Sequence, residues 1–245
     1  MLKNGKEYLR RLARFAEETL FPRAGCCLSC GDPRRADKDT CLCPFCTEKL
    51  KRETVPDGAC PRCLQPLKKG KPCAFCRSPM MRSLKNVYAP YIYADVSRRL
   101  IHQLKFNACE EAVPLLSTAM ARALNQRDFD CICPVPLHPR RLRQRGFNQS
   151  LLLARALSEE TGIPVLELLS RNVYRRPQSL SDRKERQENV RGVFACQKDP
   201  DGFRVLLLDD VRTSGATAQA CAEALLKSGA DSVSLCAAAV VYKKK

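Results

Sequence analysis

The 245-residue sequence has no tryptophan, only two histidines and an aromatic content of 6%. The low aromatic content argues against a protein that binds single-stranded nucleic acid mainly by base stacking. Neither histidine, His102 or His138, falls in the cysteine-rich region, so we expect no catalytic zinc with a histidine ligand there. No apolar run approaches the ~18 residues that a transmembrane helix needs. The sequence therefore predicts no membrane span.

The first 20 residues are charged throughout and lack the continuous apolar stretch of a secretory signal peptide. We therefore expect a cytoplasmic protein. The spacing of the apolar residues in this segment instead predicts one amphipathic helix with basic residues on its other face. Its apolar positions are Tyr8, Leu9, Leu12, Phe15 and Ala16.

Acidic residues are in short supply: 26 Asp and Glu face 43 Lys and Arg, which gives a formal charge of +17. A basic surplus of this size favours nucleic acid, anionic lipid or polyphosphate partners. The alternative is a solvated basic face without a partner. Two zinc centres of four thiolates each would lower the charge to roughly +13, so the surface stays basic under either interpretation.

Cysteine is abundant, with 16 residues, of which ten lie between Cys26 and Cys76. In a secreted protein this density would indicate a disulfide framework. Tight pairs without a signal peptide indicate metal binding instead. The six scattered cysteines are mostly flanked by apolar residues, and we interpret them as small buried hydrophobic residues.

Four Cys-x-x-Cys pairs follow one another in this region. A two-residue spacer lets both sulfurs of a turn reach one metal ion at about 2.3 Å, and two such turns complete a tetrahedron. The spacing suits two consecutive zinc sites, although a cross-braced pairing fits too, and Cys26 or Cys41 could substitute in the first site. Sites closed by four thiolates are structural, so we expect the zinc to stabilise this segment rather than to take part in chemistry. The predicted ligands are Cys27, Cys30, Cys43, Cys46, Cys60, Cys63, Cys73 and Cys76.

Beyond about residue 84 the sequence alternates between helical and strand-like patterns. Helices are predicted at 94–106, 114–124, 150–161 and 218–227, and strands at 131–136, 205–208 and 232–241. This pattern predicts an α/β domain, a parallel sheet flanked by helices, over residues 85–245. The small zinc module and the amino-terminal helix would occupy residues 1–84.

The most informative segment follows the strand at 205–208. Asp209 and Asp210 end that strand, and a loop of small and hydroxyl-bearing residues, 213–217, leads into a helix. Free backbone N–H groups at a helix start, together with the helix dipole, form an anion cradle. Two adjacent carboxylates can accept hydrogen bonds from a vicinal diol. The segment therefore predicts a ligand with a phosphate and a ribose diol, bound at the carboxyl edge of the sheet.

Two further stretches are strongly basic. Four arginines crowd the connection after the strand at 131–136, where an anion or solvent must absorb their mutual repulsion. They are Arg140, Arg141, Arg143 and Arg145. A second group, Arg183, Lys184 and Arg186, could form a mobile lid over the ligand or a plain solvated surface.

The Asp-Asp pair and its loop resemble the PRPP (phosphoribosyl pyrophosphate) signature of type I phosphoribosyltransferases. By that resemblance Asp209 and Asp210 would be the catalytic acids that hold the ribose hydroxyls, and the four arginines would hold the pyrophosphate, with Mg²⁺ arriving with PRPP. The residues implied for the 5′-phosphate are Thr213, Ser214, Gly215, Ala216 and Thr217, with Arg212 as a possible further contact. Arg212 departs from the signature, because many of these enzymes carry an apolar residue there.

The whole chain resembles the ComF family of competence proteins. The marks, besides the cysteine pairs and the Asp-Asp loop, are the segments 101–105, 135–140, 145–149, 177–181 and 189–192. The resemblance implies a bacterial protein linked to natural transformation, handling single-stranded DNA together with the DNA-uptake machinery. Two functions follow: a phosphoribosyltransferase with an unidentified acceptor, or a non-catalytic protein whose phosphate cradle and basic loops bind single-stranded DNA or a nucleotide. A ribose diol favours the first, because DNA lacks the 2′-hydroxyl.

Overall fold

The computed structural model describes residues 26–33, 36–37, 40–68, 70–106, 110–125, 128–171 and 193–242. The helix predicted near residues 8–16 and the possible lid of Arg183, Lys184 and Arg186 lie outside the described residues. The chain divides into two compact units, one ending at Lys49 and the other running from Leu50 to Lys245.

The first unit contains the first two Cys-x-x-Cys pairs. Its backbone turns tightly after Cys27, where the N–H of Gly31 donates to the carbonyl of Cys27 at 2.8 Å. Gly31 has φ of 77°, a left-handed value that favours glycine. The helix α2 (Pro44–Arg52) starts between the two cysteines of the second pair, Cys43 and Cys46. Among the described residues of this unit, local turns bring these cysteines together.

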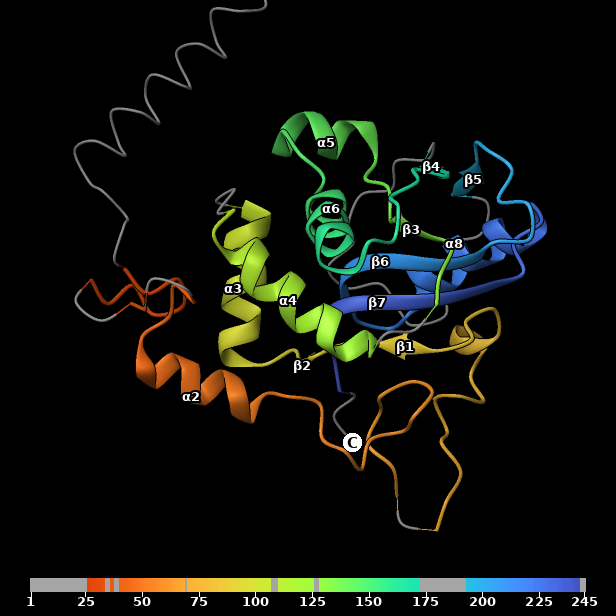
Figure 1. The fold of residues 1–245 in the computed structure, drawn as a ribbon. Helices are drawn as coiled ribbons and strands as arrows, with labels where there is room; N and C mark the ends of the chain where they lie inside the picture. Colours follow the sequence, from red (N-terminus) through yellow and green to blue (C-terminus); the bar gives the residue numbers. More distant parts are fainter. Residues whose placement is uncertain are drawn as a thin grey trace, which may run out of the picture. The chain divides into compact units, whose positions relative to one another are not determined.

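The second unit is built on a parallel sheet (Figure 1). Its strands are β1 (Val87–Tyr88), β2 (Tyr91–Ile92), β3 (Cys131–Pro134), β6 (Arg204–Arg212) and β7 (Ser232–Val240). The order is β1-β7-β6-β3, with β2 also paired to β7, and all of these pairs are parallel. The central strand β6 therefore has a neighbour on each side.

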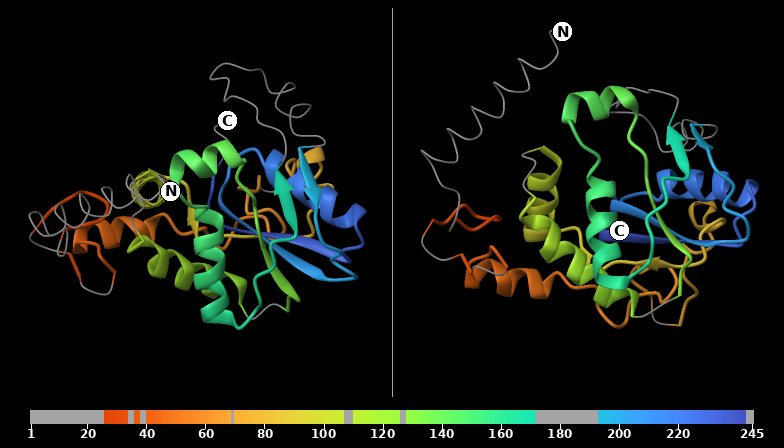
Figure 2. Two further views of the ribbon diagram at one scale, coloured as in Figure 1. Left: turned by 90° about the horizontal axis from the view of Figure 1, so that it is seen from above. Right: turned by 45° about the horizontal axis from the view of Figure 1, so that its top comes forward.

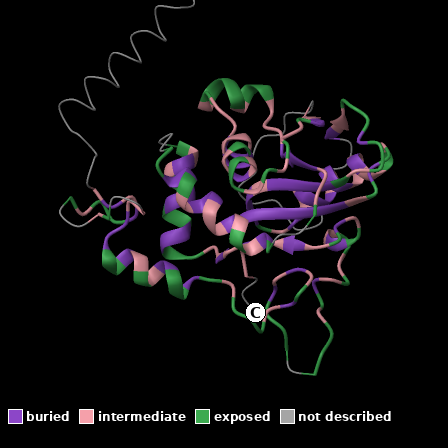
Figure 3. Ribbon diagram, viewed as in Figure 1, coloured by how far each residue is buried: buried purple, intermediate pink, exposed green. Residues whose placement is uncertain are grey.

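The sheet is parallel because its central strands are apolar on both faces. Val205, Leu206, Leu207 and Leu208 of β6 are all fully buried, and so is most of β7 (Figure 3). A strand that alternated apolar and polar residues would instead keep one face in water. The apolar run thus places β6 in the centre of the unit, covered from both sides.

Helices cover both faces of this sheet. The helices α4 (Ala112–Leu124) and α6 (Gln149–Thr161) pack on one face, and α8 (Ala216–Lys227) lies on the other (Figure 2). The helix α3 (Asp95–Phe106) packs beside α4. Two short strands, β4 (Leu169–Arg171) and β5 (Phe194–Cys196), form a separate antiparallel pair near α8. The predicted fold class, a parallel sheet flanked by helices and preceded by four-cysteine segments, is confirmed.

The boundary between units differs from the expected one after residue 84. The second unit begins at Leu50 and includes the second pair of cysteine turns. The reason is packing: Cys63, Phe75 and Met81 belong to the same hydrophobic cluster as Val205 and Leu235 of the sheet. A short helix, η1 (Pro79–Met81), extends this contact to α8. The second cysteine segment is therefore part of the core of the sheet unit.

Two local structures differ from the sequence prediction. The basic connection after β3 contains a helix, α5 (Pro139–Arg145), which starts with a proline and is capped by His138. The imidazole Nδ1 of His138 accepts a hydrogen bond from the N–H of Arg140 at 3.1 Å. The strand β6 also runs beyond the predicted residue 208 to Arg212, because Val211 and Arg212 still pair with β7.

Among the described helices, none is both long and apolar enough to cross a membrane.

A buried carboxylate holds the start of α3 in the second unit. Glu53 is 8% exposed, and its two carboxylate oxygens accept hydrogen bonds from the N–H groups of Val96 and Ser97, each at 2.8 Å. We expect Glu53→Ala to lower the free energy of unfolding by about 1–3 kcal/mol, because both helix-start N–H groups lose a charged acceptor. Urea unfolding of the zinc-loaded protein measures this. Exposed Glu159, changed to Ala, is the control and should shift stability by less than about 0.5 kcal/mol; equal effects of the two changes would contradict the capping role.

Candidate functional site

The acid pair lies near the carboxyl end of β6, next to the starts and ends of neighbouring helices. Asp209 accepts hydrogen bonds from the hydroxyl of Ser150 at 3.3 Å and from the N–H of Asp210 at 2.9 Å. The carboxylate of Asp210 forms an ion pair with Lys105, with 2.9 Å between Oδ2 and Nζ. The site therefore combines the end of a central strand with the amino end of α6 and the carboxyl end of α3.

The surroundings of Asp209 change its ionisation. Burial and the charge of Asp210 raise the pKa of Asp209 to about 7. The N–H of Asp210, the ammonium of Lys105 and the hydroxyl of Ser150 oppose this rise but do not cancel it. Because this pKa is close to neutral pH, Asp209 can gain or lose a proton at little energetic cost. A ligand that forms a hydrogen bond with Asp209 can therefore select either form.

The loop after β6 leads into the amino end of α8. Gly215 caps the helix with φ of 86°, and the Ser214 hydroxyl accepts a hydrogen bond from the N–H of Ala216 at 3.3 Å. Among the described residues, the backbone N–H groups of Ser214, Gly215 and Thr217 have no acceptor. Thr213 is exposed. Unbonded N–H groups at the start of a 12-residue helix are suited to bind an anion.

Arg212 differs from its sequence interpretation as a phosphate contact. Its side chain is only 2% exposed, and one Nη donates a hydrogen bond to the carbonyl of Cys63 at 3.2 Å. The guanidinium also lies 4.8 Å from the ring centre of Phe75. Because the side chain is directed into the second cysteine segment, it does not fit a contact with phosphate in the loop.

The four arginines of the basic connection are divided by their position on α5. Arg140 and Arg143 are exposed, whereas Arg141 and Arg145 are half-buried. Arg145 donates to the side-chain oxygen of Gln149 at 2.6 Å and stacks over Phe106, with 5.3 Å from guanidinium to ring centre. Burial lowers the pKa of Arg145, while the charge of Asp210 raises it. The structure thus brings Arg145 close enough to interact with the charge of Asp210, and Arg141 lies near Arg145.

Sequence reasoning assigned no role to two cations near the acid pair. Lys105 lies in one of the family-like segments, but no pattern pointed to its ion pair with Asp210. Arg171, at the end of β4, packs over Phe194, and its Nε is buried without a hydrogen-bond partner among the described residues. Burial and the nearby charge of Arg141 both lower the pKa of Arg171. A bound anion would reduce the repulsion between the half-buried guanidinium of Arg171 and the neighbouring one of Arg141.

The eight predicted cysteine ligands form two separate groups. Within each group the sulfur atoms all lie within 4.8 Å of one another. Sulfur–sulfur distances are 3.8 Å for Cys30–Cys43, 3.5 Å for Cys60–Cys76 and 3.4 Å for Cys63–Cys73. A tetrahedral zinc ion at about 2.3 Å from each sulfur requires about 3.8 Å between sulfurs, so both groups fit zinc. The pairing is consecutive rather than cross-braced, and Cys26 and Cys41 belong to neither group.

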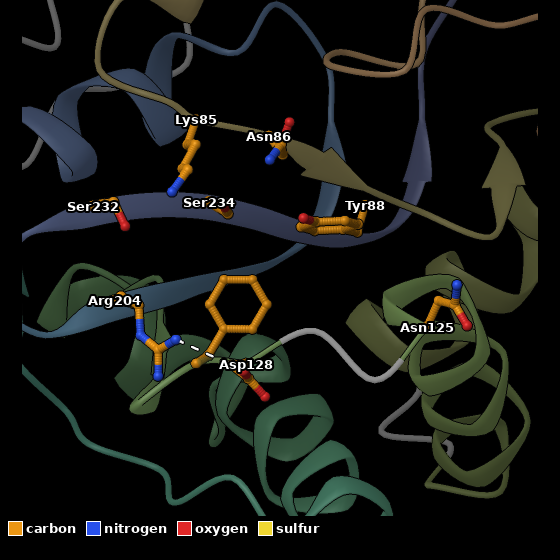
Figure 4. A pocket seen from close by; sticks show the side chains of 9 residues that line it. Lys85, Asn86, Tyr88, Asn125, Asp128, Arg204, Ser232 and Ser234 are labelled. Carbon is orange, nitrogen blue, oxygen red and sulfur yellow. Dashed lines mark ion pairs between the residues drawn. The ribbon is translucent and has the colours of Figure 1, made fainter.

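A pocket of about 600 Å³ opens at the opposite edge of the sheet. Lys85, Tyr88, Phe129 and Arg204 line it, and Figure 4 shows Arg204 joined to Asp128 by an ion pair, with 3.9 Å between the atoms. Arg204 begins β6, five residues before Asp209, which corresponds to about 16 Å along a strand. The pocket therefore contains none of the predicted site residues.

The ionisation of Asp209 makes a testable prediction about stability. Its pKa is raised to about 7, so the folded protein holds a proton between about pH 4 and 7 that the unfolded chain releases. The stability from this group is present at low pH and lost as the pH rises through 7. We expect Asp209→Asn to have a higher Tm than the wild type at about pH 8, with the difference shrinking toward about pH 4.5.

Asp130 is the matched control with the opposite sign. Hydrogen bonds from Arg204 lower the pKa of Asp130 to about 2, so its stabilisation is present above its ordinary pKa of 3.8 and lost as the pH falls toward 2. Asp130→Asn should therefore have a lower Tm than the wild type at about pH 8. Thermal unfolding across the pH range measures both, and a lower Tm for Asp209→Asn at about pH 8 would refute the buried-acid assignment.

Comparison with known proteins identifies relatives along most of the chain. No family model matches. The chain is 32% identical over 217 residues to the DNA utilization protein YhgH of Escherichia coli K12, covering 85% of this chain and 87% of that protein. It is 28% identical over 203 residues to the competence protein ComFC of Bacillus subtilis, covering 78% and 80%.

Solved structures match only in part. The glutamine PRPP amidotransferase of B. subtilis has a TM-score of 0.38 and 24% identity, covering 53% of this chain and 26% of that one. An overlap of this size has no bearing on function. The sequence relatives are decisive, because they share about a third of their residues with this chain over nearly their whole length. The chain belongs to the ComF family.

Proposed function

We propose that this protein binds PRPP or a related phosphorylated ribose at the carboxyl end of β6, as a phosphoribosyltransferase-type member of its family. The observation that carries the proposal is that Asp209 and Asp210 lie near the end of β6, a few residues before a loop with free N–H groups. The N–H groups of Ser214, Gly215 and Thr217 have no acceptor among the described residues. An acid pair and an anion cradle about one loop apart suit a ligand that carries a diol and a phosphate.

The phosphate would occupy the start of α8. Its oxygens would accept hydrogen bonds from the N–H groups of Gly215 and Thr217, and the hydroxyls of Thr213 and Thr217 would add further donors. The positive end of the α8 dipole favours the same position. Gly215 is suited to this place because its φ of 86° is unfavourable for other residues.

The ribose would lie against the acid pair. Asp209 and Asp210 would accept hydrogen bonds from the 2′ and 3′ hydroxyls, and Lys105 would keep the charge of Asp210 compensated at 2.9 Å. A carboxylate accepts such bonds better than a carboxylic acid. Because the pKa of Asp209 is about 7, binding of the diol would favour its deprotonated form and lower that pKa.

The pyrophosphate would lie toward Arg141, Arg145 and Arg171. Burial lowers the pKa values of Arg145 and Arg171, and an anion beside them would relieve that cost. Mg²⁺ would enter bound to the pyrophosphate. In the reaction the bond from C1′ to the pyrophosphate oxygen breaks with its electron pair, and a nucleophile bonds to C1′ and loses its proton. The arginines would stabilise the leaving charge electrostatically.

Calorimetry with PRPP and Mg²⁺ tests the pocket. The double variant Asp209→Asn/Asp210→Asn should bind at least about tenfold more weakly than the wild type, since two charged acceptors are lost. Asp128→Asn, in the pocket at the other sheet edge, is the control and should bind as the wild type does. Arg141→Gln leaves the acid pair and its ion pair intact, and it should also weaken binding. Undiminished affinity in the folded double variant would remove the ribose assignment.

The alternative is a non-catalytic protein that binds single-stranded DNA or a nucleotide through the same cradle. Two observations favour it: the relatives are named for DNA utilization and competence, and the formal charge is +17. Phosphate-driven binding weakens steeply with salt, with a slope of about −0.7 per neutralised phosphate on single strands. Fluorescence anisotropy with an oligothymidylate should give such a slope. A flat salt response, or binding unaffected by Arg141→Gln, would dismiss this alternative at the site.

A further inference from the structure

Arg212 is a buried cation without a carboxylate partner among the described residues. It ends β6, and its side chain is 2% exposed. Its Nη2 donates to the carbonyl of Cys63, whereas its Nε and Nη1 are buried without a hydrogen-bond partner among the described residues. A charge in this state is costly, because two of its three guanidinium nitrogens are buried without an acceptor among the described residues. Some other negative charge is needed to compensate it.

The groups around this guanidinium belong to the second cysteine segment and to Tyr242. Phe75 lies beneath it at 4.8 Å, and the sulfurs of Cys63, Cys73 and Cys76 are close enough to interact with its charge. Four thiolates and one Zn²⁺ sum to a net charge of −2. A zinc centre at this group would therefore supply the missing negative charge, and Arg212 would reduce the charge of the centre to −1.

The same residue begins the phosphate loop. Arg212 directly precedes Thr213, and Gly215 lies beside Phe75 of the second cysteine segment and Met80 of η1. A Cβ on Gly215 would lie 3.5 Å from Met80 and 3.6 Å from Phe75. The ring of Phe75 thus lies beside the guanidinium of Arg212 and also faces the position that a side chain at residue 215 would occupy. The second cysteine group and the phosphate loop therefore both lie next to Phe75.

We propose that Arg212 is a positioning residue: it neutralises the second four-cysteine zinc centre and fixes the phosphate loop to it. The proposal goes beyond ligand binding, because it concerns metal retention whether or not PRPP is the ligand. It also accounts for an arginine where the resembled signature carries an apolar residue. Loss of either partner leaves the other with an uncompensated charge in the core, and the loop loses its support.

Zinc release into an excess of a coloured chelator tests this. In the wild type two zinc ions per chain are released, one from each cysteine group. Arg212→Met keeps a similar volume without the charge. In this variant we expect zinc release from the second cysteine group to become about tenfold to a hundredfold faster, which corresponds to the free energy of one charge-assisted hydrogen bond. The phase from Cys27, Cys30, Cys43 and Cys46 should stay unchanged and is the internal control.

Two further variants separate charge from packing and folding. Arg212→Lys retains the charge and should release zinc at a rate closer to the wild type than to Arg212→Met. Arg204→Met removes an arginine from the exposed end of the same strand and should leave both phases unchanged. If Arg212→Lys releases zinc as fast as Arg212→Met, the role is packing alone and the charge proposal is wrong; two unchanged phases in Arg212→Met would overturn it as well.

Hydrogen exchange measures the link to the loop. In folded Arg212→Met, the amides of residues 213–218 should exchange faster than in the wild type, and those in the centre of β7 should not. Selective zinc loss from the second group should produce the same pattern in the wild type. Unchanged loop exchange after zinc loss would contradict the coupling. Because this readout needs no ligand, it is independent of whether PRPP binds.

Discussion

Burial of β6 between β3 and β7 is the constraint on which the rest of the second unit depends. Four consecutive apolar residues are fully removed from water, each contributing about 1.5–3 kcal/mol relative to an exposed position. The pairing on both sides fixes the strand's register and hence the point at which it emerges. Asp209, Asp210 and Arg212 are carried to the sheet edge by this strand, so their positions follow from hydrophobic burial rather than from their own interactions.

Three charges at the end of a buried strand are expensive, and each is compensated differently. Asp210 has an ion pair with Lys105, and Asp209 has hydrogen bonds together with a raised pKa. Arg212 has one carbonyl, one aromatic ring and the neighbouring thiols. Incomplete compensation of this kind is common where a site is arranged for a ligand rather than for stability.

The two cysteine groups have the same ligand pattern but different surroundings. The described residues around the first group form turns and the start of α2, and a metal ion would contribute much of the stability of this segment. The second is part of the hydrophobic cluster that contains Val205 and Leu235. A metal ion there would stabilise a segment that already packs against the sheet and supports Gly215.

The sequence by itself predicted the central strands, the main helices and the two cysteine groups, because these depend on local patterns. The apolar run at 205–208 predicted a buried parallel strand, and the Cys-x-x-Cys spacing predicted cysteine groups of four thiols that could hold a metal ion. Both patterns can be recognised within short stretches of the sequence. The helices at 94–106 and 150–161 were within two residues of α3 and α6 for the same reason.

Only the tertiary structure decided which charged side chains meet. Arg212 follows the acid pair in sequence, but pairing of β6 with β7 turns its side chain toward Cys63, 149 residues away along the chain. Lys105 of α3 contacts Asp210, and Arg171 of β4 lies close enough to interact with the charge of Asp209. No local pattern encodes an interaction between distant elements. The direction of a side chain at a strand end depends on what packs on each face of the sheet, and that is settled only when the chain is folded.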